Sequence, residues 1–264
     1  MPRRALPGIE FWLSTATVMA VIGVWYAVTE TKLVTAVLVP SPQKVVQALS
    51  TTLQEGYKGK SLLEHLAASL YRLLGSFALV LVTAIPLGLL SGLNSRVRAV
   101  LDPLVEFYRP LPPLAYYTLL VLWFGIDDTS KMALLYLGGF APVFLACAGA
   151  VRKVKPDWVN AALTLGATKR QVFFRVIFPA CLPDIFTGMR TAMGVAYGTL
   201  VAAEMVAAVS GIGWMVLDAS KFLRSDIIFL GILLMGGTGI LIDQGFRWWE
   251  RRVLRWRATL PEAA

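Results

Sequence analysis

The sequence predicts an all-α, polytopic membrane protein with about six transmembrane helices and both termini in the cytoplasm. Apolar residues make up 57% of the 264 residues and charged residues only 16%, against roughly 25% in soluble domains. The mean hydropathy is +0.66. The apolar residues form long runs without charge, and most basic residues lie between alternate runs. This pattern excludes a disordered chain, a coiled coil and an ordinary soluble enzyme, and it predicts one transmembrane domain over residues 1–264.

The transmembrane helices are expected where charge is absent, because a crossing needs about 20 mostly apolar residues. Glu204 interrupts one such run, and another extends past Asp243. The six runs are residues 11–29, 73–95, 110–126, 132–151, 191–217 and 227–242. The first run ends in bulky residues around Trp25, whereas a cleaved signal peptide ends in small ones, so we expect a retained helix.

The basic residues predict the orientation, because cytoplasmic loops are enriched in Lys and Arg. With both termini inside, 17 of the 25 basic residues lie on the inner side. They are Arg3, Arg4, Arg96, Arg98, Arg109, Arg152, Lys153, Lys155, Lys169, Arg170, Arg175, Arg190, Arg247, Arg251, Arg252, Arg255 and Arg257. The outer side holds Lys32, Lys44, Lys58, Lys60, Arg72, Lys131, Lys221 and Arg224. The net charge of +9 therefore reflects the orientation of the chain in the lipid membrane. No nucleic-acid partner is expected.

The outer segment from residue 30 to residue 66 predicts one short amphipathic helix, with apolar residues at helical spacing. These are Val45, Val46, Leu49 and Leu53. Residues 56–61 end like a phosphate-binding loop, but Gln54 stands where the first glycine is needed, so we expect a turn. His65 is the only histidine and is expected to be a solvated loop residue. No histidine-based metal site or catalytic triad can be built within the chain.

The inner segment of about residues 152–184 predicts two short helices. Asp157 is a candidate N-cap for a helix from Trp158. The small residues of this helix leave one side nearly bare, and Gly166 favours a turn after it. They are Ala161, Ala162, Gly166 and Ala167. Thr168 and Gln171 have the spacing of a capping box for the second helix.

The second inner helix is expected to carry an apolar face, to end at Pro179 and to be followed by a membrane helix that opens at Pro183. The apolar face comprises Val172, Phe173, Val176 and Ile177.

Residues 160–167, followed by residues 174–179 and Pro183, resemble the EAA loop of ABC-importer permeases. The two alanines, the glycine and both prolines match, whereas Asn160 replaces the glutamate of the motif. The resemblance implies a coupling helix that docks on an ATPase. The residues assigned to coupling are Asn160, Ala161, Ala162, Gly166, Ala167, Thr168, Lys169 and Arg170.

Other stretches are similar to the taurine, sulfonate, nitrate and bicarbonate branch of these importers, with taurine permeases nearest in pattern. They are residues 101–103, 108–113, 123–126 and 199–204. The resemblance implies a multi-pass permease of the bacterial inner membrane for a small anion or aminosulfonate, taurine first, with alkanesulfonate, nitrate or bicarbonate as alternatives. It also implies a second copy of the chain, two cytoplasmic ATPase subunits that use ATP and Mg, and a periplasmic binding protein.

Two other classes of membrane protein would be expected to show different features in the sequence. A stand-alone secondary transporter usually shows inverted repeats and midplane ion sites. An intramembrane enzyme needs at least a nucleophile with a base or a metal site. The sequence shows neither set of features, so the chain is expected to be non-catalytic and to bind no cofactor itself.

Glu204 lies in an apolar run and must face a cavity, a partner or the bundle interior. One interpretation places Glu204 near the pathway or outer gate, together with Gly211 and Gly213. The alternative is that its carboxylate makes a hydrogen bond with a purely structural role. Residues 210–213 are not expected to form a stable helix, so a short segment from Trp214 turns back toward the pore. The Gly88/Gly92 and Gly194/Gly198 pairs predict close helix packing.

Overall fold

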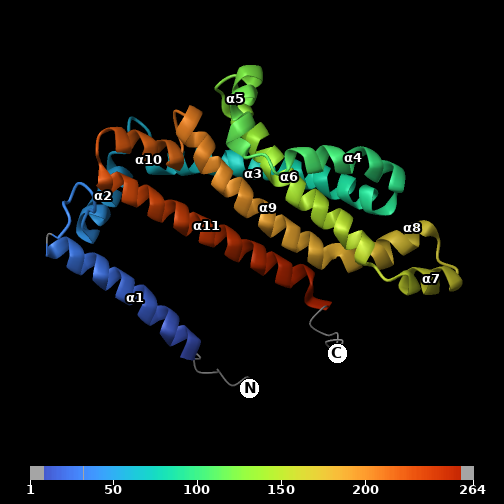
Figure 1. Ribbon diagram of the computed structural model, residues 1–264. Helices are drawn as coiled ribbons and strands as arrows, with labels where there is room; N and C mark the ends of the chain where they lie inside the picture. Colours follow the sequence, from blue (N-terminus) through green and yellow to red (C-terminus); the bar gives the residue numbers. More distant parts are fainter. Residues whose placement is uncertain (1–8, 32, 257–264) are drawn as a thin grey trace. The chain divides into compact units, whose positions relative to one another are not determined.

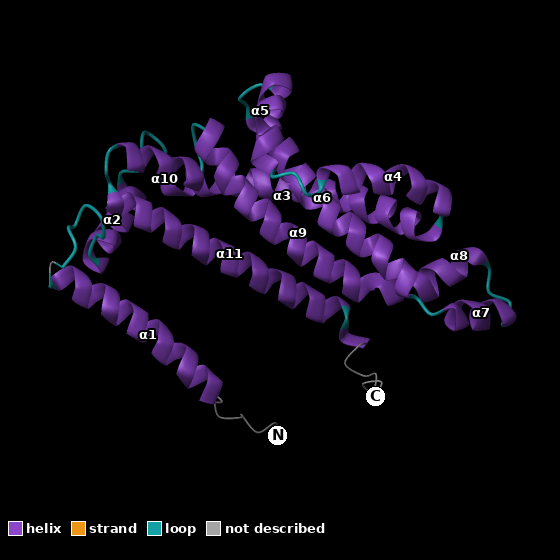
Figure 2. Cartoon of the chain, in the orientation of Figure 1, coloured by secondary structure: helices purple, strands orange, loops and turns teal. Residues whose placement is uncertain are grey.

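The computed structural model describes residues 9–31 and 33–256, so Arg3, Arg4, Lys32 and Arg257 lie outside the described residues. Over the described ranges the chain is almost entirely helical, and its one isolated bridge joins Tyr57 and Lys60 (Figures 1 and 2). The chain forms two compact units. The first comprises the chain up to His65 and Met215–Leu234, and the second comprises Leu66–Trp214 and the chain from Met235.

The helices are, in chain order, α1 (Ile9–Glu30), α2 (Pro42–Gln54), α3 (Leu62–Leu93), α4 (Ser95–Tyr108), α5 (Pro113–Phe124), α6 (Asp128–Lys153), α7 (Pro156–Thr164), α8 (Lys169–Val172), the π-helical turn Phe173–Ile177, α9 (Phe178–Ala207), α10 (Ile212–Lys221) and α11 (Ser225–Val253). Five helical segments in the described ranges are long and apolar enough to cross a membrane. They lie within α1, α3, α6, the continuous segment Lys169–Ala207 and α11.

The third expected span is not a single membrane-crossing helix. The run at residues 110–126 forms only the 12-residue helix α5, which reaches about 18 Å at 1.5 Å per residue. Three prolines at its start shorten it, because proline cannot donate the helical hydrogen bond.

The chain nevertheless returns across the membrane between α3 and α6, because these two helices are parallel. Arg72, near the start of α3, contacts Asp128 at the start of α6. Near their ends, Gly88 lies against Phe144, and Gly92 lies against Val151. Two parallel, aligned spans require a crossing between them, which α4 and α5 make in two pieces.

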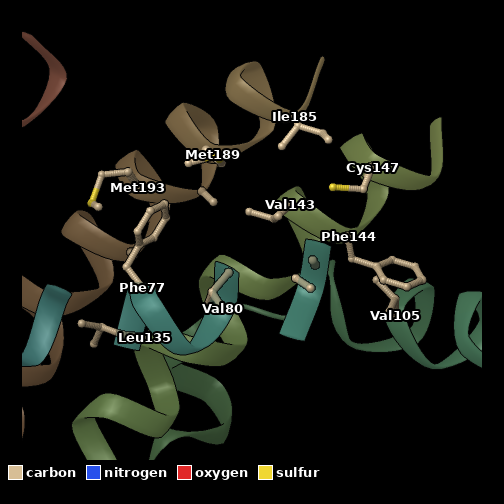
Figure 3. Packing of buried hydrophobic residues seen from close by; sticks show 14 of the residues in the cluster. Phe77, Val80, Val105, Leu135, Val143, Phe144, Cys147, Ile185, Met189 and Met193 are labelled. Carbon is tan, nitrogen blue, oxygen red and sulfur yellow. The ribbon is translucent and has the colours of Figure 1, made fainter. Parts of the chain in front are cut away.

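The core of the second unit packs α3, α6 and α9 together (Figure 3). A Cβ on Gly88 would lie 2.7 Å from the Cβ of Cys147, so the predicted packing of Gly88 and Gly92 is confirmed. Gly194 and Gly198 do not pack within the chain as expected, since a Cβ on either would meet no described atom within 4 Å. Farther along, α9 is antiparallel to the second half of α11, where Arg190 and Asp243 pair at 3.0 Å.

The first unit contains the predicted amphipathic helix α2, whose buried face is formed by Val45, Ala48 and Thr52. The turn predicted after it is confirmed, with Gly56 and Gly59 at positive φ. The expectation for His65 was wrong: its side chain is fully buried and lies 3.1 Å from the Tyr57 carbonyl. Burial and the bond from its hydroxyl to Asp218 at 2.9 Å raise the pKa of Tyr57 above its usual value.

Candidate functional site

The first candidate region is a polar cluster formed by Ser69, Arg72, Asp128, Glu204 and Ser210. Glu204 lies in the last turn of α9 and is 1% exposed. The Ser69 hydroxyl lies 2.8 and 3.0 Å from its two carboxylate oxygens. The backbone N–H of Gly213 donates to the same carboxylate at 2.9 Å. The carboxylate therefore faces the protein interior, which was one of the three surroundings expected from the sequence.

Arg72 completes the cluster from α3, where it is only 3% exposed. Its guanidinium donates to Glu204 at 2.7 Å, to Asp128 at 2.8 Å and to the Ser210 carbonyl at 2.8 Å. A further bond reaches the Ser210 hydroxyl at 3.1 Å. One arginine thus ties α3 to the start of α6, the end of α9 and the bend after it. A buried charge is tolerated only when it is paired and hydrogen-bonded in this way.

Gly211 and Gly213 let the backbone approach the carboxylate. Gly211 has φ +123°, and a Cβ there would overlap the Glu204 carboxyl group. A Cβ on Gly213 would lie 2.8 Å from the Val201 carbonyl oxygen. The expected break in the helix is present at residues 208–211, but α10 begins at Ile212, so Gly213 is helical. Glu204 satisfies a first-turn N–H of α10, much as an N-cap does.

A cavity of about 450 Å³ adjoins the cluster and is lined in part by Arg72, Asp128 and Lys131. Lys131 is 2% exposed, and its ammonium donates to the carbonyls of Ile126 and Asp127 at 2.6 and 3.0 Å.

Arg72 and Lys131 were assigned to the outer side of the membrane with no further role, and the structure places both in helices with buried side chains. The sequence held one signal for Arg72. It directly precedes a charge-free run, and Glu204, which interrupts another apolar run, needs a basic partner.

The second candidate region is the 152–184 loop, in which α7 and α8 are joined by a tight turn. The helix α7 begins two residues earlier than expected: Lys155 is the N-cap, Pro156 follows it and Asp157 lies in the first turn. Proline is favoured at the first helical position, because its missing N–H is not needed there.

The predicted turn at Gly166 is confirmed, with φ +84°. The N–H of Gly166 donates to the Leu163 carbonyl at 2.9 Å, and that of Ala167 donates to the Ala162 carbonyl at 3.0 Å. This pair of bonds is a Schellman motif. The predicted capping box is also present, with Thr168 accepting from the N–H of Gln171 at 3.3 Å.

The structure exposes part of the small-residue side of α7 and covers the rest. Asn160, Ala161 and Gly166 are exposed, as are Thr168, Lys169 and Arg170, whereas Ala162 and Ala167 are half-buried. Two large apolar residues that were not predicted also lie on the surface: Leu165 is 88% exposed and Trp158 is 52% exposed.

Pro179 does not end the second helix, and Pro183 does not open a new one. The chain is helical without interruption from Lys169 to Ala207. A π-helical turn at Phe173–Ile177 precedes Pro179, and the N–H of Phe178 donates back to the Phe173 carbonyl. The wider turn accommodates a proline that would break a regular helix.

Comparison with known proteins identifies relatives over most of the chain. The profile of the family described as "Binding-protein-dependent transport system inner membrane component" matches residues 84–255. The taurine transport system permease protein TauC of Escherichia coli K12 is 41% identical over 245 residues, which cover 92% of this chain and 89% of that protein.

The putative aliphatic sulfonates transport permease protein SsuC of Bacillus subtilis 168 is 34% identical, covering 93% of this chain and 88% of that protein. The bicarbonate transport system permease protein CmpB of Synechococcus elongatus is 32% identical, covering 77% and 73%. Among solved structures, an inward-facing MetNI methionine ABC transporter matches with a TM-score of 0.61, covering 73% of this chain and 95% of the matched chain. At 16% identity, that match supports the fold alone.

Proposed function

Because the chain belongs to the family of binding-protein-dependent transport system inner membrane components, we propose that it carries taurine across a bacterial inner membrane. The chain is a multi-pass permease of an ABC importer. Family membership favours this assignment over a stand-alone secondary transporter and an intramembrane enzyme. The proposal for taurine is supported by the 41% identity to a taurine permease over nearly the whole chain.

Aliphatic sulfonates, bicarbonate and nitrate are the competing substrates, and the first two are supported by relatives at 34% and 32% identity. The test is uptake of labelled taurine, an alkanesulfonate and nitrate by cells that carry the full system. We expect taurine to be taken up at the lowest external concentration. Preferred uptake of another member of the panel would refute the proposal for taurine and leave the importer assignment in place.

The coupling role belongs to the same proposal. The 152–184 loop would dock on a cytoplasmic ATPase subunit that binds ATP and Mg, while this chain binds neither. Two copies of the chain, two ATPase subunits and a periplasmic binding protein would form the transporter. The observation that supports docking is the exposed, locally stabilised turn at Gly166 beside Ala161 and Leu165. Co-purification of an ATPase subunit with the tagged permease tests it.

The orientation is proposed from the basic residues at the end of α11. Arg247, Arg251, Arg252 and Arg255 follow the apolar part of this helix, which places the C-terminus in the cytoplasm by the positive-inside rule. A C-terminal reporter that is active only in the periplasm should stay silent. An active reporter would reverse the orientation and the side assigned to the 152–184 loop.

A further inference from the structure

A second cavity, of about 230 Å³, lies between the α4–α5 bend and the middle of α6 and α9. Its lining includes Tyr108, Arg109 and Tyr116. The α6 residues that line it begin at Leu137 and end at Pro142, about 14–21 Å along the helix from Asp128 at 1.5 Å per residue. The cavity therefore lies near the middle of the membrane crossing, where transporters place their substrate sites.

The polar groups of this cavity have no partners among the described residues. The Tyr108 hydroxyl is buried and makes no hydrogen bond. Such a group costs about 1–3 kcal/mol if nothing satisfies it. The Tyr116 hydroxyl likewise has no partner in the described part of the chain. The nearby Tyr136 hydroxyl differs, because it pairs with Thr83 at 3.1 Å.

Arg109 adds a positive charge without a counter-ion. Its side chain is exposed and forms no ion pair or hydrogen bond with any residue that the structure describes. The sequence pattern had assigned Arg109 to the inner surface, but it follows the last residue of α4, which has returned from the end of α3. A charged side chain at this depth is costly against lipid and is found facing water or a polar partner. Hydroxyl and guanidinium groups are donors that suit an oxyanion.

We propose that Tyr108, Arg109 and Tyr116 form an oxyanion subsite within the translocation pathway. This inference rests on the proposed function and adds to it the place where the substrate's anionic end is held during passage. The guanidinium would attract the sulfonate group, and the two hydroxyls would donate to its oxygens. The remaining lining is apolar, including Leu137 and Val195, so it suits the short carbon chain of an aminosulfonate.

The test compares Tyr108→Phe and Arg109→Gln in the complete transporter, with labelled taurine as the probe. Tyr108→Phe removes one hydroxyl that has no protein partner, so the fold should be unaffected. A lost hydrogen bond to a charged group should lower the rate of uptake at limiting taurine about tenfold. Arg109→Gln should lower it further, and Arg109→Lys should restore part of the rate. Matched controls are Tyr71→Phe, at an exposed tyrosine of α3, and Arg96→Gln, at an exposed arginine after α3.

The readouts separate the subsite from the transporter assignment. The subsite is supported if both variants purify with their ATPase and hydrolyse ATP, yet transport less taurine than the controls. If the wild type takes up taurine and both Tyr108→Phe and Arg109→Gln take it up at the wild-type rate, the subsite is overturned. The proposed function would still stand. If the wild type carries another oxyanion and not taurine, the proposed substrate fails, and the same variants tested with that ion still decide the subsite.

Discussion

The polar cluster and the 152–184 loop lie at opposite ends of one continuous helix, and they satisfy their polar groups in opposite ways. In the cluster, Arg72 and Glu204 are buried and are held by residues distant in sequence. In the loop, Thr168 and Gln171 satisfy each other, and the turn at Gly166 closes on its own helix. The difference implies that the cluster depends on charge and distant contacts, whereas the loop depends on local shape.

The largest effect is expected from Glu204→Leu, because it leaves Arg72 buried beside an apolar side chain. Breaking one partner of a buried pair typically costs about 3–5 kcal/mol. Glu204→Gln should cost less, because the amide can still bond Ser69 and the Gly213 N–H. Thermal unfolding of the purified permease and its yield in membranes measure both. Equal stability with complete loss of uptake in both variants would show that the charge acts in transport itself.

The next effect is expected from Gly211→Ala, which tests how closely the backbone fits around the carboxylate. The added methyl would overlap Glu204 at a positive φ, and we expect a loss of about 2–4 kcal/mol from strain and steric overlap together. Gly125→Ala is the control, since Gly125 also has positive φ but open space around it. If the two variants unfold at the same temperature, the close fit contributes nothing.

In the 152–184 loop, at the other end of the continuous helix, Gly166→Leu should leave the membrane helices intact and abolish ATPase binding. The turn needs φ +84°, and a large side chain would also occupy the docking surface. Ala162→Leu should give a weaker defect of the same kind. Gly166→Asn is the control, because asparagine tolerates this φ better than other residues. Pull-down of the ATPase from solubilised membranes measures the loss.

The smallest effect is expected from Lys169→Ala and Arg170→Ala. Both side chains are exposed, and exposed ion pairs are typically worth about 0–1 kcal/mol. ATPase binding in the pull-down should change by less than about fivefold in either variant. If Lys169→Ala and Arg170→Ala abolish ATPase binding while Gly166→Leu binds normally, docking is electrostatic. The contrast between the polar cluster and the 152–184 loop would then disappear.

The parts of the fold that sequence predicted correctly are those that local patterns determine. The capping box at Thr168, the turn at Gly166 and the break before Ile212 each depend on residues within a few positions of one another. The long spans follow from charge-free runs, which composition alone reveals. Their ends were less accurate, since α3 begins at Leu62, well before the expected residue 73.

The parts that sequence missed depend on tertiary contacts. Arg72 and Glu204 are 132 positions apart. The sequence indicates that Glu204 needs a basic partner, but it does not indicate which basic residue supplies it. The burial of His65 and the exposed position of Leu165 likewise follow from packing. Pro179 gave a local signal that was misleading, because the π-helical turn at Phe173–Ile177, which ends two residues before it, absorbs its effect.

That wider turn has a mechanical consequence. Because the helix is not broken at Pro179, Lys169–Ala207 is a single rod of 39 residues, about 58 Å long at 1.5 Å per residue. Its ends carry the 152–184 loop and Glu204. A tilt of about 5° about the loop end of a rod of that length displaces the far end by about 5 Å. The unbroken helix therefore has the geometry of a lever arm, in which a small rotation about the loop end becomes a displacement of several ångströms at the end that carries Glu204.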